Sequence, residues 1–353
     1  MRAAAAALAV AIALGAPARA EAPFDPQAEF DAFWTLFDER YALFEVKHVD
    51  WDAVRAVYAP RVGPATTRAD LFALFEEATE LLNDVHVTVE DTGTGRFARS
   101  GGRGLGTGPF DAGTFSIDLI AERYTDAGLT EWAGGAVRYG TMEGGEIGYL
   151  HLGTFRYPTT TAAALDAAVA AFAEARTVVV DVRQNGGGSD AVARIVAGRF
   201  ADRRRPYMTV EQRVVGSDAF DAPVLWHIEP MGPAQHHGPV VVLTNDRTIS
   251  AAETFVLAMR SLPHVLVVGE TTAGVMADAY PMPAGDGWVF GLPVNVMRDV
   301  HGLSWEGIGL PPDLWAANDP REVAAGTDRV LETAIAFAGQ TAPGPRRRVV
   351  PTR

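Results

Sequence analysis

Cysteine is absent from the 353 residues, and lysine occurs once, as Lys47; every other basic side chain is an arginine. The lack of cysteine excludes disulfides, thiol nucleophiles, cysteine-ligated metal centres and lipidation of an N-terminal cysteine. Because the single lysine lies near the N-terminus, the later strand–helix units can hold neither a Gly-Lys-Ser/Thr phosphate loop nor a Schiff-base lysine. The composition is otherwise that of a globular protein, with 48% hydrophobic and 21% charged residues.

Positive charge is scarce overall. The chain has 30 Lys+Arg against 44 Asp+Glu, a formal net charge of −14. A nucleic-acid-binding protein needs a basic face, so we expect no nucleic-acid partner. No apolar run reaches the roughly 20 residues that cross a bilayer, so we expect no stable membrane insertion. The oligomeric state cannot be read from these patterns.

The first 20 residues have the pattern of a secretory signal peptide. Met1-Arg2 gives a short basic start, residues 3–14 are continuously apolar, and small residues stand at Ala18 and Ala20. This order predicts cleavage after Ala20. Together with the absence of cysteine, it predicts a periplasmic or secreted protein whose folding depends on its core alone.

Apolar periodicity divides the rest of the chain. Aromatic residues spaced by three and four positions indicate helices early in the chain, whereas short valine-rich runs alternate with helical patterns later. Such alternation indicates an α/β layered domain. We therefore predict an N-terminal helical subdomain over residues 21–90, a Gly-rich loop and linker over 91–143, a core over 144–340 and a flexible tail over 341–353.

Two patterns that could indicate other chemistry are interpreted as loops. Asp91-Thr92-Gly93 matches the aspartic-protease triplet, but that chemistry needs a second copy, which the chain lacks. The pair His236-His237 could suggest a metal site. Adjacent side chains point in different directions, however, and no histidine or carboxylate follows at helical spacing. We therefore expect no metal and no cofactor.

Residues 181–188 (Asp-Val-Arg-Gln-Asn-Gly-Gly-Gly) form the most specific local pattern. A buried strand ends in a polar turn, and a helix follows near Ser189. Three successive glycines exceed what a tight turn needs and allow a ligand to approach the backbone closely. Free N–H groups at this position suit an anion or a developing oxyanion.

Ser250 lies at the start of a helix that follows the buried strand over residues 240–243. With Glu253 it forms the Ser-x-x-Glu pattern of a helix capping box. The same position suits a nucleophile, because the helix N-terminus stabilises nearby negative charge. The two interpretations are compatible, and no other serine has this strand–turn–helix setting.

A serine nucleophile needs a base. Lys47 belongs to the first helical region, so the candidates are the eight histidines. His86 stands at a junction between a predicted helix and a predicted strand, where a side chain can point into a cleft.

These patterns together resemble the serine peptidase family of C-terminal (tail-specific) processing proteases, tricorn core proteases and interphotoreceptor retinoid-binding modules. The N-terminal aromatic region is also similar to the helical segment that precedes the core in the tricorn-like branch. Five motifs occur in the family's order: residues 82–86 (Leu-Asn-Asp-Val-His), 181–188, 248–253 (Thr-Ile-Ser-Ala-Ala-Glu), 268–274 (Val-Gly-Glu-Thr-Thr-Ala-Gly) and 306–313 (Glu-Gly-Ile-Gly-Leu-Pro-Pro-Asp).

The resemblance implies a catalytic mechanism. The processing-protease branch uses a lysine where this chain has Val275, so its Ser–Lys dyad is absent. The tricorn-like branch implies Ser250 as the nucleophile, His86 as the general base and Glu306 as the group that orients His86. Tricorn has a serine directly before that histidine, where this chain has Val85, so Asp84 is an alternative orienting group.

The resemblance also implies the surroundings of the site. Backbone N–H groups of Ala251 and Gly187 would form the oxyanion hole. The implied fold is the β-β-α spiral core shared with crotonase and Clp-type peptidases, preceded by the helical subdomain. The implied substrate is a peptide or an unfolded protein. Two other functions fit the same residues: a noncatalytic module that binds an apolar ligand, as in the retinoid-binding branch, and an esterase.

Overall fold

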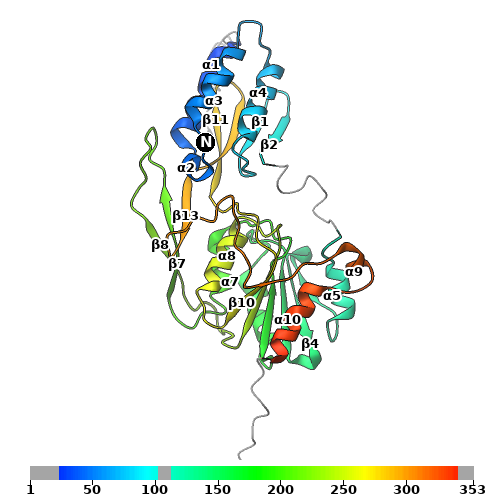
Figure 1. Ribbon diagram of the computed structural model, residues 1–353. Helices are drawn as coiled ribbons and strands as arrows, with labels where there is room; N and C mark the ends of the chain where they lie inside the picture. Colours follow the sequence, from blue (N-terminus) through cyan, green and yellow to red (C-terminus); the bar gives the residue numbers. More distant parts are fainter. Residues whose placement is uncertain (1–23, 102–112, 341–353) are drawn as a thin grey trace, which may run out of the picture.

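The computed structural model describes residues 24–101 and 113–340 (Figure 1). The predicted signal peptide over 1–20 and the predicted tail over 341–353 lie outside the described residues. The α-helices are α1 (Pro26–Arg40), α2 (Phe44–Lys47), α3 (Trp51–Tyr58), α4 (Arg68–Glu80), α5 (Ile117–Arg123), α6 (Ala162–Ala171), α7 (Asp190–Ala197), α8 (Ala251–Arg260), α9 (Pro320–Ala324) and α10 (Arg329–Gln340). The strands are β1 (Thr88–Asp91), β2 (Arg96–Arg99), β3 (Thr130–Trp132), β4 (Val137–Met142), β5 (Ile147–Leu152), β6 (Thr177–Asp181), β7 (Arg205–Gln212), β8 (Val224–Ile228), β9 (Val240–Thr244), β10 (Val265–Gly269), β11 (Ala279–Ala284), β12 (Trp288–Pro293), β13 (Asn295–Asp299) and β14 (Leu314–Trp315).

A seven-stranded sheet forms the centre of the core, in the order β14-β10-β9-β6-β5-β4-β3. Its middle strands β5, β6, β9 and β10 run parallel. Successive side chains of a strand point to opposite faces. Val178 and Val180 accordingly join the apolar cluster of α6, α7 and α8, whereas Val179 joins that of α5 and α10. Helices on both faces explain why these strands are valine-rich throughout.

The N-terminal helices pack on a second sheet, in the upper part of Figure 1. This four-stranded sheet has the order β11-β12-β1-β2, so two of its strands come from residues 279–293. Phe33, Phe37 and Phe75 from the helices contact Phe290 of β12, with ring centroids 5.3, 5.7 and 5.6 Å apart. The N-terminal aromatic stripe therefore buries itself against the C-terminal third of the chain.

Topology brings the candidate motifs to one edge of the core sheet. The glycine-rich loop follows β6 and Ser250 follows β9, and these neighbouring strands are parallel. The carboxyl ends of parallel strands lie at the same edge, where α/β proteins bind their ligands. The predicted α/β core preceded by a helical subdomain is confirmed. Among the described residues, no helix is both long and apolar enough to span a membrane.

Candidate active site

Ser250 occupies a sharp turn between β9 and α8. Its backbone has φ 62° and ψ −124°, a left-handed conformation that non-glycine residues seldom adopt. Its N–H lies 2.9 Å from the carbonyl oxygen of Val275 and 3.2 Å from Glu253 Oε2. Strain of this kind, on the order of 1–3 kcal/mol, persists only where the surroundings hold it. The half-buried Ser250 side chain is thus presented at the helix N-terminus.

Glu253 holds this turn in place. The carboxylate is buried and accepts hydrogen bonds from Thr272 Oγ1 at 2.6 Å, the Gly274 N–H at 2.7 Å and the Val275 N–H at 2.8 Å. Burial raises its pKa, although each of these hydrogen bonds favours the ionised form. The carboxylate half of the predicted capping box is therefore present. Glu253 also fixes residues 272–275 beside Ser250.

The glycine-rich loop packs directly on Ser250. A Cβ on Gly187 would lie 2.7 Å from both Ile249 O and Ser250 Cβ, and the residue has φ 84°. Only glycine fits this approach. The Gly187 N–H donates to Asn185 Oδ1 at 2.9 Å, whereas the Ala251 N–H meets no acceptor within the described part of the chain. Ala251 therefore offers a free donor beside Ser250, and Gly187 offers one that Asn185 already engages.

His86 stands on the turn between α4 and β1 and is half-buried. Burial lowers the pKa of its imidazole, while Asp84 acts in the opposite direction. The ring is accordingly neutral near pH 7, as a general base requires. Its Nδ1 is buried, and within residues 24–101 and 113–340 it has no hydrogen-bond partner.

Asp84 is fully buried and stabilises the turn that carries His86 by a hydrogen bond to its backbone. Its Oδ1 accepts the His86 N–H at 3.0 Å, and its Oδ2 accepts the Tyr41 hydroxyl at 2.9 Å. Both carboxylate oxygens therefore have donors other than the imidazole ring.

Glu306 lies in the loop after β13 and is 4% exposed. Its Oε2 accepts the N–H groups of Met276 at 2.8 Å and Ala277 at 3.1 Å. Its Oε1 has no hydrogen-bond partner among the described residues and lies 3.6 Å from Lys47 Nζ. Burial, followed by the charge of Asp84, raises the pKa of Glu306 to about 8, although Lys47 acts to lower it.

One segment, residues 272–277, connects these groups. Its backbone binds Ser250, Glu253 and Glu306 through the hydrogen bonds given above. The neighbours of His86 and Ser250 also meet there, because Val85, Ile249 and Val275 form one small apolar cluster. The fold thus brings the motifs of Ser250, His86 and Glu306 together, although the described residues show no hydrogen bond from either ring nitrogen of His86. Catalytic hydrogen bonds are often long or misaligned before substrate binds.

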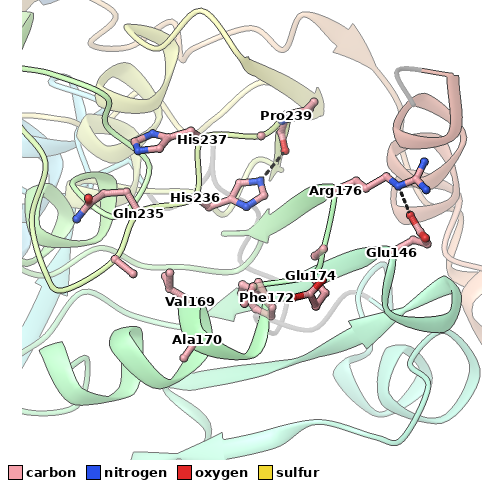
Figure 2. A pocket seen from close by; sticks show the side chains of 14 residues that line it. Glu146, Val169, Ala170, Phe172, Glu174, Arg176, Gln235, His236, His237 and Pro239 are labelled. Atoms are coloured by element: carbon pink, nitrogen blue, oxygen red, sulfur yellow. Dashed lines mark hydrogen bonds and ion pairs between the residues drawn. The ribbon is translucent and has the colours of Figure 1, made fainter. Parts of the chain in front are cut away.

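The histidine pair 236–237 lies elsewhere. Both residues line a cavity of about 890 Å³ together with Arg176 and Glu146, which precede β6 and β5. Figure 2 shows these lining side chains. This is the opposite edge of the sheet from Ser250. His236 Nε2 lies 3.4 Å from Pro239 O. No group of three or more histidine, aspartate or glutamate side chains among the described residues could hold a metal ion.

The sequence patterns do not single out Lys47 or Tyr41. Lys47 belongs to the first helical region, far along the chain from Glu306, yet α2 brings it to that side chain. Tyr41 belongs to an aromatic stripe in the sequence. Nothing in that pattern indicates that its hydroxyl donates to the buried Asp84 carboxylate. The uniqueness of Lys47 was the one available signal.

Comparison with known proteins gives two family matches. Residues 146–315 match Peptidase family S41, and residues 25–80 match the Tricorn protease C1 domain. Tricorn protease homolog 1 of Streptomyces coelicolor is 24% identical over 400 aligned positions, which cover 89% of this chain and 35% of that protein. Carboxy-terminal processing protease CtpA of Bacillus subtilis is 30% identical over 165 positions, covering 46% of this chain and 32% of that protein. The chain thus spans about a third of the length of these relatives.

Solved structures share the fold. A putative peptidase from Parabacteroides merdae superimposes with a TM-score of 0.79 at 26% identity, covering 90% of this chain and 99% of that one. Mature CPAF, at 13% identity and a TM-score of 0.66, covers 90% of this chain and 98% of its own, and shows the likeness of fold alone. The matches confirm the family resemblance that the five motifs carry. They show a Peptidase family S41 domain over residues 146–315, with a Tricorn protease C1 domain ahead of it over residues 25–80.

Proposed function

We propose that this chain is an exported serine peptidase that hydrolyses peptide bonds in peptides or unfolded proteins. Ser250 is the nucleophile, His86 the general base and Glu306 the group that orients His86. The observation that carries the proposal is the strained turn at Ser250, which the buried Glu253 holds at a helix N-terminus. Strain that surrounding groups enforce is typical of functional sites.

The geometry supports a two-step acyl transfer. Ser250 Oγ attacks the carbonyl carbon of the scissile peptide while His86 takes the hydroxyl proton. The oxyanion of the tetrahedral intermediate accepts hydrogen bonds from the Ala251 N–H and from the Gly187 N–H, which exchanges Asn185 Oδ1 for the oxyanion. The intermediate collapses when the C–N bond breaks and His86 returns the proton to the leaving amine. Water then attacks the acyl-enzyme with His86 again acting as the base, which releases the acid and regenerates Ser250.

Glu306 supports this role better than Asp84. Both oxygens of Asp84 already accept donors, whereas Glu306 Oε1 and His86 Nδ1 each lack a hydrogen bond within the described residues. A carboxylate oxygen and a ring N–H complement each other, directly or through one water. Glu306, whose raised pKa of about 8 places its ionisation at weakly alkaline pH, stabilises in its ionised form the imidazolium that forms when Ser250 is deprotonated.

Fluorophosphonate labelling tests the nucleophile. We expect the wild-type protein to be labelled and to cleave a peptide mixture, and Ser250→Ala to lose both, with kcat at least ~10³-fold lower. Ser261→Ala is the matched control, because Ser261 caps the other end of the same helix and its hydroxyl donates to Ala258 O. Labelling that persists in Ser250→Ala would overturn the assignment.

The same preparation distinguishes the other functions. A higher kcat/KM on ester libraries than on peptide libraries would favour an esterase. A wild-type protein that is folded, yet neither labelled nor active, would favour a noncatalytic binding module. Export is tested by expressing the full chain in a Gram-negative host and sequencing the N-terminus from each fraction, where we expect Glu21 first in the periplasm or medium.

A further inference from the structure

Lys47, the only lysine in the sequence, is a half-buried residue at the C-terminal end of α2, and its side chain is largely covered. Its Nζ lies 3.6 Å from Glu306 Oε1, and the two side chains are 7% and 3% exposed. Removing a lysine ammonium from water costs free energy, so a covered lysine needs an anionic or hydrogen-bonding partner. The Lys47 side chain is long enough to reach solvent from α2. It points instead at the Glu306 carboxylate, which the proposed mechanism requires.

The contact joins three segments that are distant in sequence. Lys47 comes from the helical subdomain, and its Nζ also donates to the Asn83 carbonyl at 3.3 Å. Asn83 is three residues before His86 on the same turn. The third segment is the Glu306 loop, where a Cβ on Gly307 would lie 3.6 Å from Nζ. One ammonium thus contacts both the His86 turn and the Glu306 loop.

The charges around Glu306 make this ammonium necessary. Asp84 on the His86 turn and Glu253 on α8 both disfavour ionisation of Glu306, and the Tyr41 hydroxyl after α1 also lies within its electrostatic reach. Lys47 acts in the opposite direction, together with the N–H of Met276. With Lys47 present the pKa of Glu306 is about 8; without it, a buried carboxylate beside two others would stay protonated to higher pH and could not stabilise an imidazolium there.

We propose that Lys47 is a positioning residue for the hydrolysis proposed above: its ammonium favours the ionised form of Glu306 and clamps the Glu306 loop to the turn that carries His86. This inference rests on the proposed function. Under it, the helical subdomain supplies part of the active site, and the site is complete only when α2 is docked. Lys47 is not a base for Ser250, and its effect passes through Glu306.

Three variants test the effect on catalysis. Lys47→Met is expected to lower kcat about 10–100-fold with little change in KM, and to move the ascending limb of the pH–rate profile to higher pH, because Glu306 then ionises later. Lys47→Arg keeps the charge and is expected to restore the position of that limb. Arg55→Met is the matched control, since Arg55 pairs with Asp31 on the exposed side of the same subdomain. A folded Lys47→Met with wild-type kcat and pH profile would overturn the proposal.

A second readout does not depend on activity. Because the chain holds one lysine, ¹³C-lysine labelling gives a single side-chain spin system, and its Cε shift follows the charge of the neighbouring carboxylate. We expect an inflection at the titration of Glu306 in wild type and in Ser250→Ala, and its loss in Glu306→Gln. An inflection that persists in Glu306→Gln would overturn the proposal even in an active enzyme. An inactive wild type that shows the Glu306-dependent inflection would overturn only the proposed function.

Discussion

At the scale of single residues, Gly187 is the position where one added carbon has the clearest consequence. An alanine there would place its Cβ 2.7 Å from Ile249 O and Ser250 Cβ, at φ 84°. The loop must shift away from Ser250, and displacements near 1 Å at a reacting centre cost about 10²-fold in rate. We therefore expect Gly187→Ala to lower kcat by about 10²-fold and the melting temperature by several degrees.

Gly186→Ala is the control for this prediction. A Cβ on Gly186 meets no atom within 4 Å. Its melting temperature should stay at the wild-type value in the same thermal scan. A Gly187→Ala variant that matched wild type in kcat would show that the loop does not determine the geometry at Ser250.

Glu306 predicts a pH dependence of stability. Burial and Asp84 raise its pKa from 4.5 to about 8 in the folded protein. The folded state therefore binds a proton that the unfolded chain releases. The resulting stability is complete below the unfolded pKa near 4.5 and is lost as the pH rises through about 8. We expect Glu306→Gln to remove this loss.

Urea unfolding at pH 5 and pH 8.5 measures this loss of stability with rising pH. The decrease in the free energy of unfolding between the two values should be smaller in Glu306→Gln than in wild type. It should stay at the wild-type size in Glu143→Gln, which replaces an exposed glutamate. Equal decreases in all three proteins would contradict the assignment.

Local sequence was sufficient for some of the site and not for the rest. Ser250 and the glycines over residues 186–188 are singled out by the sequence because strand–turn–helix geometry extends over only a few residues. Lys47 is not, because its partner Glu306 is reached only through the packing of α2 on a loop far along the chain. The pattern around Lys47 shows a charged residue at a helix end, which ordinarily faces solvent.

At the scale of elements, the motif over residues 181–188 contains polar side chains that other parts of the protein satisfy. Arg183 is 2% exposed and lies 2.6 Å from Asp181 Oδ2 and 2.9 Å from Asp328 Oδ1. It thereby ties the end of β6 to the start of α10. Asn185 donates to Leu152 O at 2.8 Å and accepts the Gly187 N–H. The sequence indicates that polar groups follow a buried strand, but not whether protein or ligand satisfies them.

Arg183→Met should therefore strongly lower the free energy of unfolding. The change leaves two buried carboxylates without their cation, which costs about 3–5 kcal/mol. Arg176→Met is the matched control at the other end of β6. Its pair with Glu146 has both side chains 53% exposed and is worth about 0–1 kcal/mol. Chemical denaturation of the two variants checks the difference, and similar losses would mean that the buried network contributes little.

At the scale of the whole molecule, the sequence predicts where strands lie but not which strands pair with each other. The junction at His86 predicts a strand after it; the structure has β1 there, and β12 lies alongside it. Their pairing, with Val89 opposite Phe290, joins positions about 200 apart in the chain. Period-two patterning fixes which side chains share a face but not which strand lies alongside. The helical subdomain and the core are therefore distinct in their sequence patterns. In the structure they are joined, because β11 and β12 complete the sheet on which the N-terminal helices pack.

That continuity predicts how the molecule unfolds. Phe290 is fully buried among aromatic rings of α1 and α4, so Phe290→Ala should cost about 3–5 kcal/mol. Because its strand belongs to the C-terminal third of the chain, the loss should lower one common calorimetric transition rather than release the helices alone. Phe97→Ala, which truncates a ring that is 57% exposed on β2, should leave that transition unchanged. Two separate transitions, of which Phe290→Ala moves only the first, would show that the helical part folds independently and that docking of Lys47 onto Glu306 is reversible in the folded core.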